Sequence, residues 1–209
     1  MEFYNITEDK IFYNTVYLKD TTFKVENEEG TEEELSGQDT YFLDKLNNEE
    51  LKELGIATVS RQEVPSDVSI FQDIKENKKY VEEDNTYQIS YEIVDKPLDT
   101  IKELKIEEIN YKKQEAVLQG FNYQDKVYQC STYDQTLILG KVSQLQISPS
   151  ESISWIAKDN TVTTFTSQEF MSFATALAGH IEEITFKARS LKDKVTACST
   201  KEEIEQVVW

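Results

Sequence analysis

The side chains that most often carry chemistry are few in this chain, and their spacing matches no catalytic or metal-binding motif. His180 is the single histidine among 209 residues. A histidine-based metal cluster therefore cannot form, and a catalytic triad would depend on this residue alone. His180 precedes Ile181 within a helical pattern, where a packing or surface role is expected. The sequence predicts no catalytic residue and no metal ligand.

The cysteines and glycines lead to the same prediction. Cys130 and Cys198 lack CxxC spacing, and we interpret them as small reduced core residues rather than as a disulfide or a reactive thiol. The six glycines never form the GxGxxG or GxxxxGK spacing of phosphate-binding loops. No cofactor-binding residue is predicted.

Acidic side chains are the remaining route to chemistry. Two of the 40 acids could face each other across a cleft and hydrolyse a glycosidic bond, but such pairs arise by chance at this abundance. The acidic run from Glu26 to Gly37 lacks alternating oxygen ligands around a fixed glycine, so it predicts a solvated loop rather than a calcium site. Trp155 and the tyrosines could bind sugars if exposed, although core packing explains them better.

The net charge limits the classes of partner. The 40 acidic and 22 basic residues give a charge of −18 at pH 7, which repels phosphate backbones and anionic lipids. The sequence has no apolar run of the roughly 18 residues that a membrane-spanning helix needs. Its start, MEFYNITEDK, lacks the basic and apolar regions of a secretory signal. We expect no nucleic-acid partner, no membrane insertion and synthesis in a cytoplasm.

A long C-terminal helix is the element against which the others are expected to pack. Thr166 and Glu169 have capping-box spacing, so the helix should begin near Ser167. A further pair of capping boxes, beginning at Ser199 and Thr200, predicts a short final helix. Along the long helix, apolar residues recur in steps of four and three and define a narrow seam that should be buried. The seam residues are Phe170, Ala174, Leu177, Ile181, Ile184, Ala188, Leu191, Val195 and Cys198.

The N-terminal half carries mostly strand signals. Aromatic and β-branched residues predict strands at 3–6, 11–18 and 56–59. A short helix capped by Asn47 and ended by Gly55 should lie between the last two strands.

A hairpin is predicted farther along this half, after a weak extended segment at 68–74. Asp84 and Asn85 both tolerate positive φ and predict a two-residue turn. The strand after the turn should bury one face, because apolar and polar residues alternate along it. The apolar set is Tyr87, Ile89, Tyr91 and Ile93.

Helices dominate after Pro97. Residues 98–119 form a helical pattern, opened by Asp99 or Thr100 and ended by Gly120. Two apolar stripes on this helix predict contact on two sides. One stripe is Leu104, Tyr111 and Leu118, and the other is Ile106, Ile109, Ala116 and Val117.

The segment between the two longer helices has mixed signals. Residues 121–129 alternate like a strand, and Thr132 with Gln135 has capping-box spacing ahead of a middle helix. The stretches SISWIA and TVTTF flank residues 158–160 and predict a second hairpin leading into the long helix.

Several features of residues 100–209 occur together in one known family. They are Gly120-Phe121 at a helix end, Tyr133-Asp134-Gln135 opening the middle helix, Trp155 in a strand, Phe165-Thr166 with Phe170 at the cap, Lys187 to Lys192, and Trp209. The stretch resembles a C-terminal domain of unknown function found in tail-fibre and fibre-assembly proteins of tailed bacteriophages. The first half looks like the arrangement that often precedes this domain. The resemblance implies a tail or fibre role, without enzymatic activity or site residues.

These observations predict an α+β protein. Residues 1–96 should form a β-rich lobe, a candidate docking domain, and residues 97–209 a lobe of three main helices with a β-hairpin. The leading hypothesis is a non-enzymatic structural component of a phage tail, located in the virion and bound to other tail or fibre proteins. The alternatives are a fibre-assembly chaperone and an acid-dependent depolymerase of cell-surface glycan.

The seam of the long helix leaves two packing alternatives. It could pack against other helices of its own lobe, or against copies of itself in a homo-oligomer. Its alanines and cysteine suit close packing against Leu104, Tyr111 and Leu139, so the intramolecular alternative is favoured.

Overall fold

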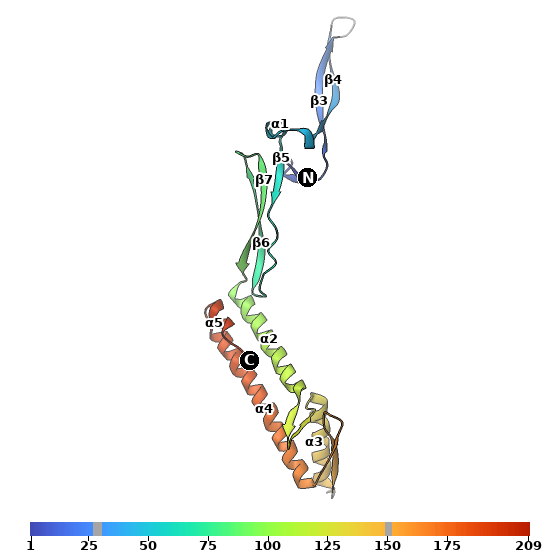
Figure 1. Cartoon of the computed structure of the whole chain (residues 1–209), viewed down its shortest axis with the longest axis vertical. Helices are drawn as coiled ribbons and strands as arrows, with labels where there is room; N and C mark the ends of the chain where they lie inside the picture. Colours follow the sequence, from blue (N-terminus) through green and yellow to red (C-terminus); the bar gives the residue numbers. More distant parts are fainter. Residues whose placement is uncertain (27–30, 149–151) are drawn as a thin grey trace. The chain divides into compact units, whose positions relative to one another are not determined.

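The computed structural model describes residues 1–26, 31–148 and 152–209 and divides into two compact units, Met1–Asp95 and Lys96–Trp209 (Figure 1). The first unit contains β1 (Phe3–Asn5), β2 (Lys10–Phe12), β3 (Val16–Glu26), β4 (Glu32–Phe42), the short 3-10 helix η1 (Leu43–Lys45), α1 (Asn48–Glu53), β5 (Ile56–Arg61), β6 (Gln72–Val81) and β7 (Thr86–Asp95). The second contains α2 (Leu98–Gln119), β8 (Phe121–Tyr123), β9 (Lys126–Tyr128), α3 (Thr132–Ile147), β10 (Ile153–Ile156), β11 (Val162–Phe165), α4 (Ser167–Ala197) and α5 (Lys201–Glu205). The predicted α+β class is confirmed.

A five-stranded sheet organises the N-terminal unit, in the order β2-β1-β5-β7-β6. Strands β5 and β7 are parallel and the other neighbours are antiparallel. Because successive side chains alternate between faces, Phe3 and Ile56 lie on one side of the sheet and Tyr4 and Ala57 on the other. Leu51 of α1 packs against the first side, while β7 contributes to the core of the second. The short helix therefore covers one face of the sheet.

The loop between β6 and β7 differs from the predicted two-residue turn. It comprises the four residues Glu82–Asn85, and Asn85 takes a positive φ of 46°. The Asn85 side chain is only 2% exposed. Its Nδ2 donates to the Ile56 carbonyl at 2.9 Å, and its Oδ1 accepts from the Tyr80 hydroxyl at 2.9 Å. The buried amide thereby fixes the longer loop against β5.

The predicted alternation along β7 holds only for its first part. Tyr87 and Ile89 are buried and Tyr91 is half-buried, but Ile93 is 40% exposed. The extended segment predicted at 68–74 is a strand only from Gln72, where β6 begins.

The predicted strand at 11–18 is in fact two strands. Strand β2 ends at Phe12 and β3 begins at Val16. The Asn14 side chain between them accepts a hydrogen bond from the Val16 N–H at 3.1 Å, a local turn that competes with continued strand pairing.

The predicted solvated loop at Glu26–Gly37 is wrong for residues 32–37, which belong to β4, while its residues 27–30 lie outside the described structure. Strands β3 and β4 form a separate two-stranded sheet with eleven cross-strand pairs. Charged and polar side chains contact each other across it, including Lys24 and Glu32 at 2.9 Å. The polar composition of these residues predicted a solvent-exposed loop. Composition alone does not show that the segment pairs with another strand. We call this two-stranded sheet the ribbon.

In the C-terminal unit, α2 runs along α4 (Figure 1). The predicted helix at 98–119 is confirmed with the same bounds. The cap prediction is wrong, because the N-cap is Pro97, whose carbonyl accepts from the Ile101 N–H at 3.0 Å. The helix begins one residue before the candidate Asp99, which instead lies in the first turn, where a carboxylate favours the helix dipole.

The two apolar stripes predicted on α2 are only partly correct, because Ile109 of the second stripe is buried and Val117 packs against the aromatic core, whereas the first stripe is wrong. Tyr111 and Leu118 are 60% and 67% exposed. The buried positions fall on one side, and they are Ile101, Lys105 and Ile109. A lysine is tolerated there because its Nζ contacts the Glu108 carboxylate at 3.0 Å.

A small hairpin of β8 and β9 replaces the single strand predicted at 121–129. Gly120 precedes it with φ of 95°, and a Cβ at this position would lie 2.7 Å from the Tyr128 carbonyl oxygen. Only glycine allows this close approach. The middle helix is confirmed as α3, but its capping box is Ser131 with Asp134 rather than Thr132 with Gln135.

Aromatic rings fill the core where the hairpins meet α4. Phe173 is fully buried, and its ring centroid lies 4.8 Å from that of Tyr128 and 5.4 Å from that of Phe165. The hairpin of β10 and β11 agrees with the prediction and supplies Phe165 and Ile153 to this core. Phe173 lies outside the predicted seam, so the buried face of α4 is wider there than its heptad pattern indicated.

The long helix α4 begins as predicted. The Thr166 hydroxyl accepts from the Glu169 N–H at 3.3 Å, and the Glu169 carboxylate accepts from the Thr166 N–H at 2.7 Å. The later seam residues Ile184, Ala188, Leu191 and Val195 are buried. A capping box of Thr200 with Glu203 likewise opens α5. Within the described residues, no helix is both long and apolar enough to cross a membrane.

Candidate interaction surfaces

Among the described residues, the histidine and the cysteines form no common cluster with acidic side chains. The His180 ring centroid is 5.3 Å from that of Phe121, and the residue is half-buried on α4. Within the described part of the chain, its Nε2 has no hydrogen-bond partner. The ring therefore packs against the aromatic core, the role that the sequence predicted.

The two cysteines are free thiols. Cys130 is buried, and its Sγ donates to the Val117 carbonyl at 3.0 Å. Burial raises the pKa of this thiol, which lowers its thiolate fraction and its reactivity. Cys198 is half-buried at the end of α4 and donates to the Lys194 carbonyl at 3.2 Å. The structure places Cys130 in the core, as predicted.

Several carboxylates have pKa values that nearby groups hold below the usual range. The Lys78 ammonium lowers the pKa of Glu76, the Lys112 ammonium lowers that of Glu115, and the Thr166 N–H lowers that of Glu169. A glycosidase acid needs the opposite shift, a raised pKa that keeps it protonated. Across residues 1–26, 31–148 and 152–209, no three histidine, cysteine or acidic side chains gather closely enough to hold a metal ion.

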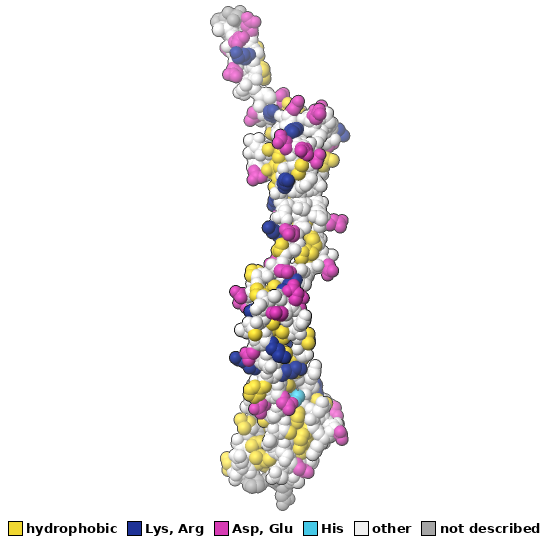
Figure 2. All heavy atoms as spheres, turned by 90° about the vertical axis from the view of Figure 1, so that its left-hand side faces the viewer, with side chains coloured by type: hydrophobic (Ala, Val, Ile, Leu, Met, Phe, Trp, Pro, Cys, Tyr) yellow, Lys and Arg dark blue, Asp and Glu magenta, His cyan; other side chains and the backbone are white. Residues whose placement is uncertain are grey.

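An apolar groove lies between α3 and α4 in the C-terminal unit. Its volume is about 490 Å³. Figure 2 shows hydrophobic side chains gathered at the surface of this unit. The described residues that line the groove are Gln135, Ile138, Leu139, Val142, Met171, Ala174, Thr175, Leu177, Ala178 and Ile181. We call this feature the α3–α4 groove.

The groove forms because each helix contributes one stripe. On each helix the lining residues recur at intervals that place them on one helix face, such as positions 135, 138, 139 and 142 on α3. Ala174 and Ala178 have short side chains and leave space that a leucine would fill. Leu139, predicted to pack against the seam, is instead 65% exposed at the groove. The predicted seam contained Ala174 but not Ala178, and it did not indicate the open space beside them.

The lining determines what the groove can do. Eight of its described residues are apolar, and Gln135 and Thr175 are neutral hydrogen-bonding groups. Such a lining fits an apolar side chain or the apolar face of a helix. It offers no ionisable group for proton transfer, so the groove suits binding.

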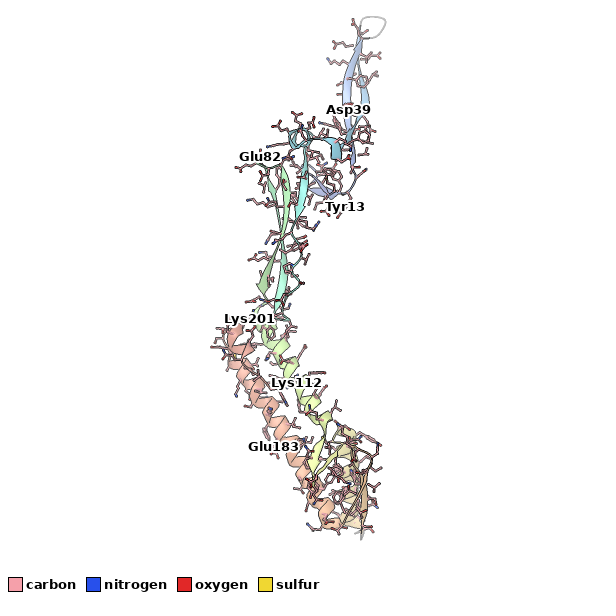
Figure 3. All side chains as sticks on the ribbon, viewed as in Figure 1. Tyr13, Asp39, Glu82, Lys112, Glu183 and Lys201 are labelled. Carbon is pink, nitrogen blue, oxygen red and sulfur yellow. The ribbon has the colours of Figure 1, made fainter. Side chains whose placement is uncertain are left out.

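A second exposed apolar surface lies on the ribbon. Phe23 and Leu35 are direct cross-strand partners, and Val25 follows on the same face. These three side chains are 50%, 44% and 41% exposed. We call them the ribbon face. Figure 3 shows side chains standing out along both strands, with Asp39 labelled on β4. The predicted loop at Glu26–Gly37 missed Leu35 as part of a strand, and no element was predicted at Phe23 and Val25, although both alternate with polar residues.

The molecule is thus an α+β protein whose described surface includes two apolar features, the α3–α4 groove and the ribbon face. The chain belongs to the family described as "Domain of unknown function (DUF4376)", whose sequence profile matches residues 100–208. The match covers nearly all of the C-terminal unit and includes the α3–α4 groove. No curated protein matches the chain. No solved structure matches it.

Proposed function

We propose that this protein is a non-enzymatic docking component of a bacteriophage tail, in or attached to the tail-fibre or receptor-binding apparatus. It is made in the host cytoplasm, binds other tail or fibre proteins and stays in the virion. The phage setting comes from the sequence resemblance of residues 100–209. The docking role is carried by one observation, the α3–α4 groove with its non-ionisable lining.

The groove supports a protein partner because of its size and composition. A space of about 490 Å³ accommodates several apolar side chains, and two helices form its walls, as in sites that receive a partner helix. Buried seam residues of α4 are already covered by the chain itself. This supports intramolecular packing of the later part of the seam. The earlier seam residues Ala174, Leu177 and Ile181 line the groove, where another molecule can reach them.

A variant at Ala178 tests this role. Ala178 lines the groove but is exposed, so Ala178→Arg should obstruct the groove without disturbing the core. Arginine is a good helix former, and the chain should fold normally. We expect at least a tenfold loss of the protein from gradient-purified particles, measured by quantitative mass spectrometry.

The matched control is Thr185→Arg, an exposed position on the same helix outside the groove. It adds the same charge and should leave incorporation unchanged. Equal incorporation of both variants at parental level would contradict docking through the groove.

A fibre-assembly chaperone is the second candidate, and the same groove favours it. A chaperone binds its client through an exposed apolar surface and must later release it. The open groove and the ribbon face are surfaces of this kind. The two functions differ in one outcome, since a chaperone would be absent from finished particles that require it to acquire fibres.

A further inference from the structure

The ribbon is a two-stranded sheet that exposes three large apolar side chains on one side. Such a sheet is only marginally stable in water and usually gains a third strand or a packed face. The base of the ribbon is anchored, because Tyr17 and Tyr41 pack against the core around Phe3. Farther along, Phe23, Val25 and Leu35 remain 41–50% exposed. The ribbon face is therefore an apolar surface of the N-terminal unit that a partner could cover.

The ribbon has two chemically different sides near this face. Directly paired residues share a side, so Phe23 and Leu35 lie on one side and Thr22 and Ser36 on the other. The Phe23 ring also lies over the backbone of Gly37, since a Cβ built there would be 2.9 Å from Phe23 Cε1. Glycine at this position lets the ring lie close across the strands. The apolar side chains are thus positioned before any partner binds.

Charge indicates the chemistry of the partner. The distal part of the ribbon carries four exposed glutamates, and the single lysine among them, Lys24, contacts Glu32 at 2.9 Å. The glutamates are Glu26, Glu32, Glu33 and Glu34. Glu33 is paired with Val25 and lies on the side of the ribbon face, whereas the other three lie on the opposite side. A second copy of this chain would bring the same acids together, and its net charge is −18. Nucleic acid and anionic lipid would be repelled for the same reason. A basic protein surface is the complement that remains.

We propose that the ribbon face docks into an apolar socket rimmed by lysine or arginine on a partner protein. Phe23 and Leu35 enter the socket, and Glu33, which lies on the same side of the ribbon, contacts its basic rim. This surface is distinct from the α3–α4 groove and lies outside residues 100–208, the part matched by the family. The partner's setting in a phage tail rests on the proposed function, whereas its surface chemistry rests on the ribbon alone.

Site-specific photo-crosslinking of the full chain tests the proposal. The probe is p-benzoylphenylalanine, placed separately at positions 23, 18 and 178 in infected cells. Leu18 is the matched control for Phe23, since it lies on the same strand and is 53% exposed, but it faces the opposite side. We expect position 23 to crosslink one protein that position 18 does not.

The crosslinked protein is then identified, purified and titrated against the full chain. Phe23→Ser and Leu35→Ser should each weaken binding about tenfold or more, and Leu18→Ser less than about twofold. Glu33→Lys, which leaves the apolar side chains in place, should also weaken binding and reduce its salt dependence. These results together would support the proposal.

The other outcomes overturn it. They are no crosslink from position 23, a crosslink only to a copy of this chain, a partner without a basic surface, or equal binding by Phe23→Ser and Leu18→Ser. Position 178 separates this inference from the proposed function. A crosslink from position 178 to a tail protein with none from position 23 refutes only the ribbon proposal. A basic partner at position 23 that is foreign to the tail refutes only the phage setting.

Discussion

The two units use their aromatic and apolar residues differently. In the C-terminal unit, Phe165, Phe170 and Phe173 are 2% exposed or less and pack in one cluster with the hairpins. In the ribbon of the N-terminal unit, Phe23 is half exposed although it belongs to a regular strand. Folding thus buries the first set within the chain and leaves the second at the surface. We therefore expect the buried phenylalanines to contribute far more to stability than Phe23 does.

The largest expected effect comes from truncating one phenylalanine in each region. Phe173→Ala removes a fully buried ring in contact with several others and should lower the free energy of unfolding by about 3–5 kcal/mol. Phe23→Ala removes a half-exposed ring and should cost less than about 1 kcal/mol. Denaturant unfolding of both variants measures this difference. Similar losses would mean that the ribbon is part of the stabilising core.

An intermediate effect is expected at the buried amide of the N-terminal unit. Asn85→Ala would leave the Ile56 carbonyl and the Tyr80 hydroxyl without the partners described above, at a cost of about 1–3 kcal/mol. Gln88→Ala is the control, because this amide is exposed on the adjacent strand β7 and its loss should cost less. Thermal unfolding followed by circular dichroism provides the measurement. Equal stability of the two variants would show that the loop does not depend on the Asn85 amide.

The smallest effect concerns the cap of α4 and its pH dependence. The Thr166 N–H and hydroxyl lower the pKa of Glu169. A carboxyl with a lowered folded-state pKa contributes stability above its unfolded pKa and loses it as the pH falls through the folded one. Glu169→Gln should therefore reduce the loss of stability in acid, measured by melts below pH 5 or so. Thr166→Ala should cost about 1 kcal/mol at neutral pH. An acid profile unchanged by Glu169→Gln would contradict this role.

The features predicted correctly from the sequence are those with local causes. Capping at Thr166, Asn47 and Thr200 depends on residues three positions apart, and the structure forms all three capping boxes. The length of α2 likewise follows from its pattern and from the glycine that ends it. Local chemistry was therefore sufficient to place the helices and the hairpin of β10 and β11.

The features missed depend on distant contacts. Strand β4 pairs Leu35 with Phe23 and Glu32 with Glu26, a partnership that an acidic segment does not indicate by itself. The α3–α4 groove depends on where α3 lies beside Ala174 and Ala178, which no spacing within either helix specifies. Both candidate surfaces are products of tertiary arrangement. Sequence spacing therefore could not predict these surfaces, whereas it was sufficient to show that the known catalytic and metal-binding motifs are missing from the sequence.

The central claim is that this chain acts as a permanent docking component, and the most direct test is its abundance in the virion. Quantitative mass spectrometry of gradient-purified particles should find the protein at a fixed ratio to known tail proteins. The ratio should remain constant across the gradient peak. Absence of the protein from particles that nevertheless require it to acquire fibres would contradict the claim and identify a chaperone instead.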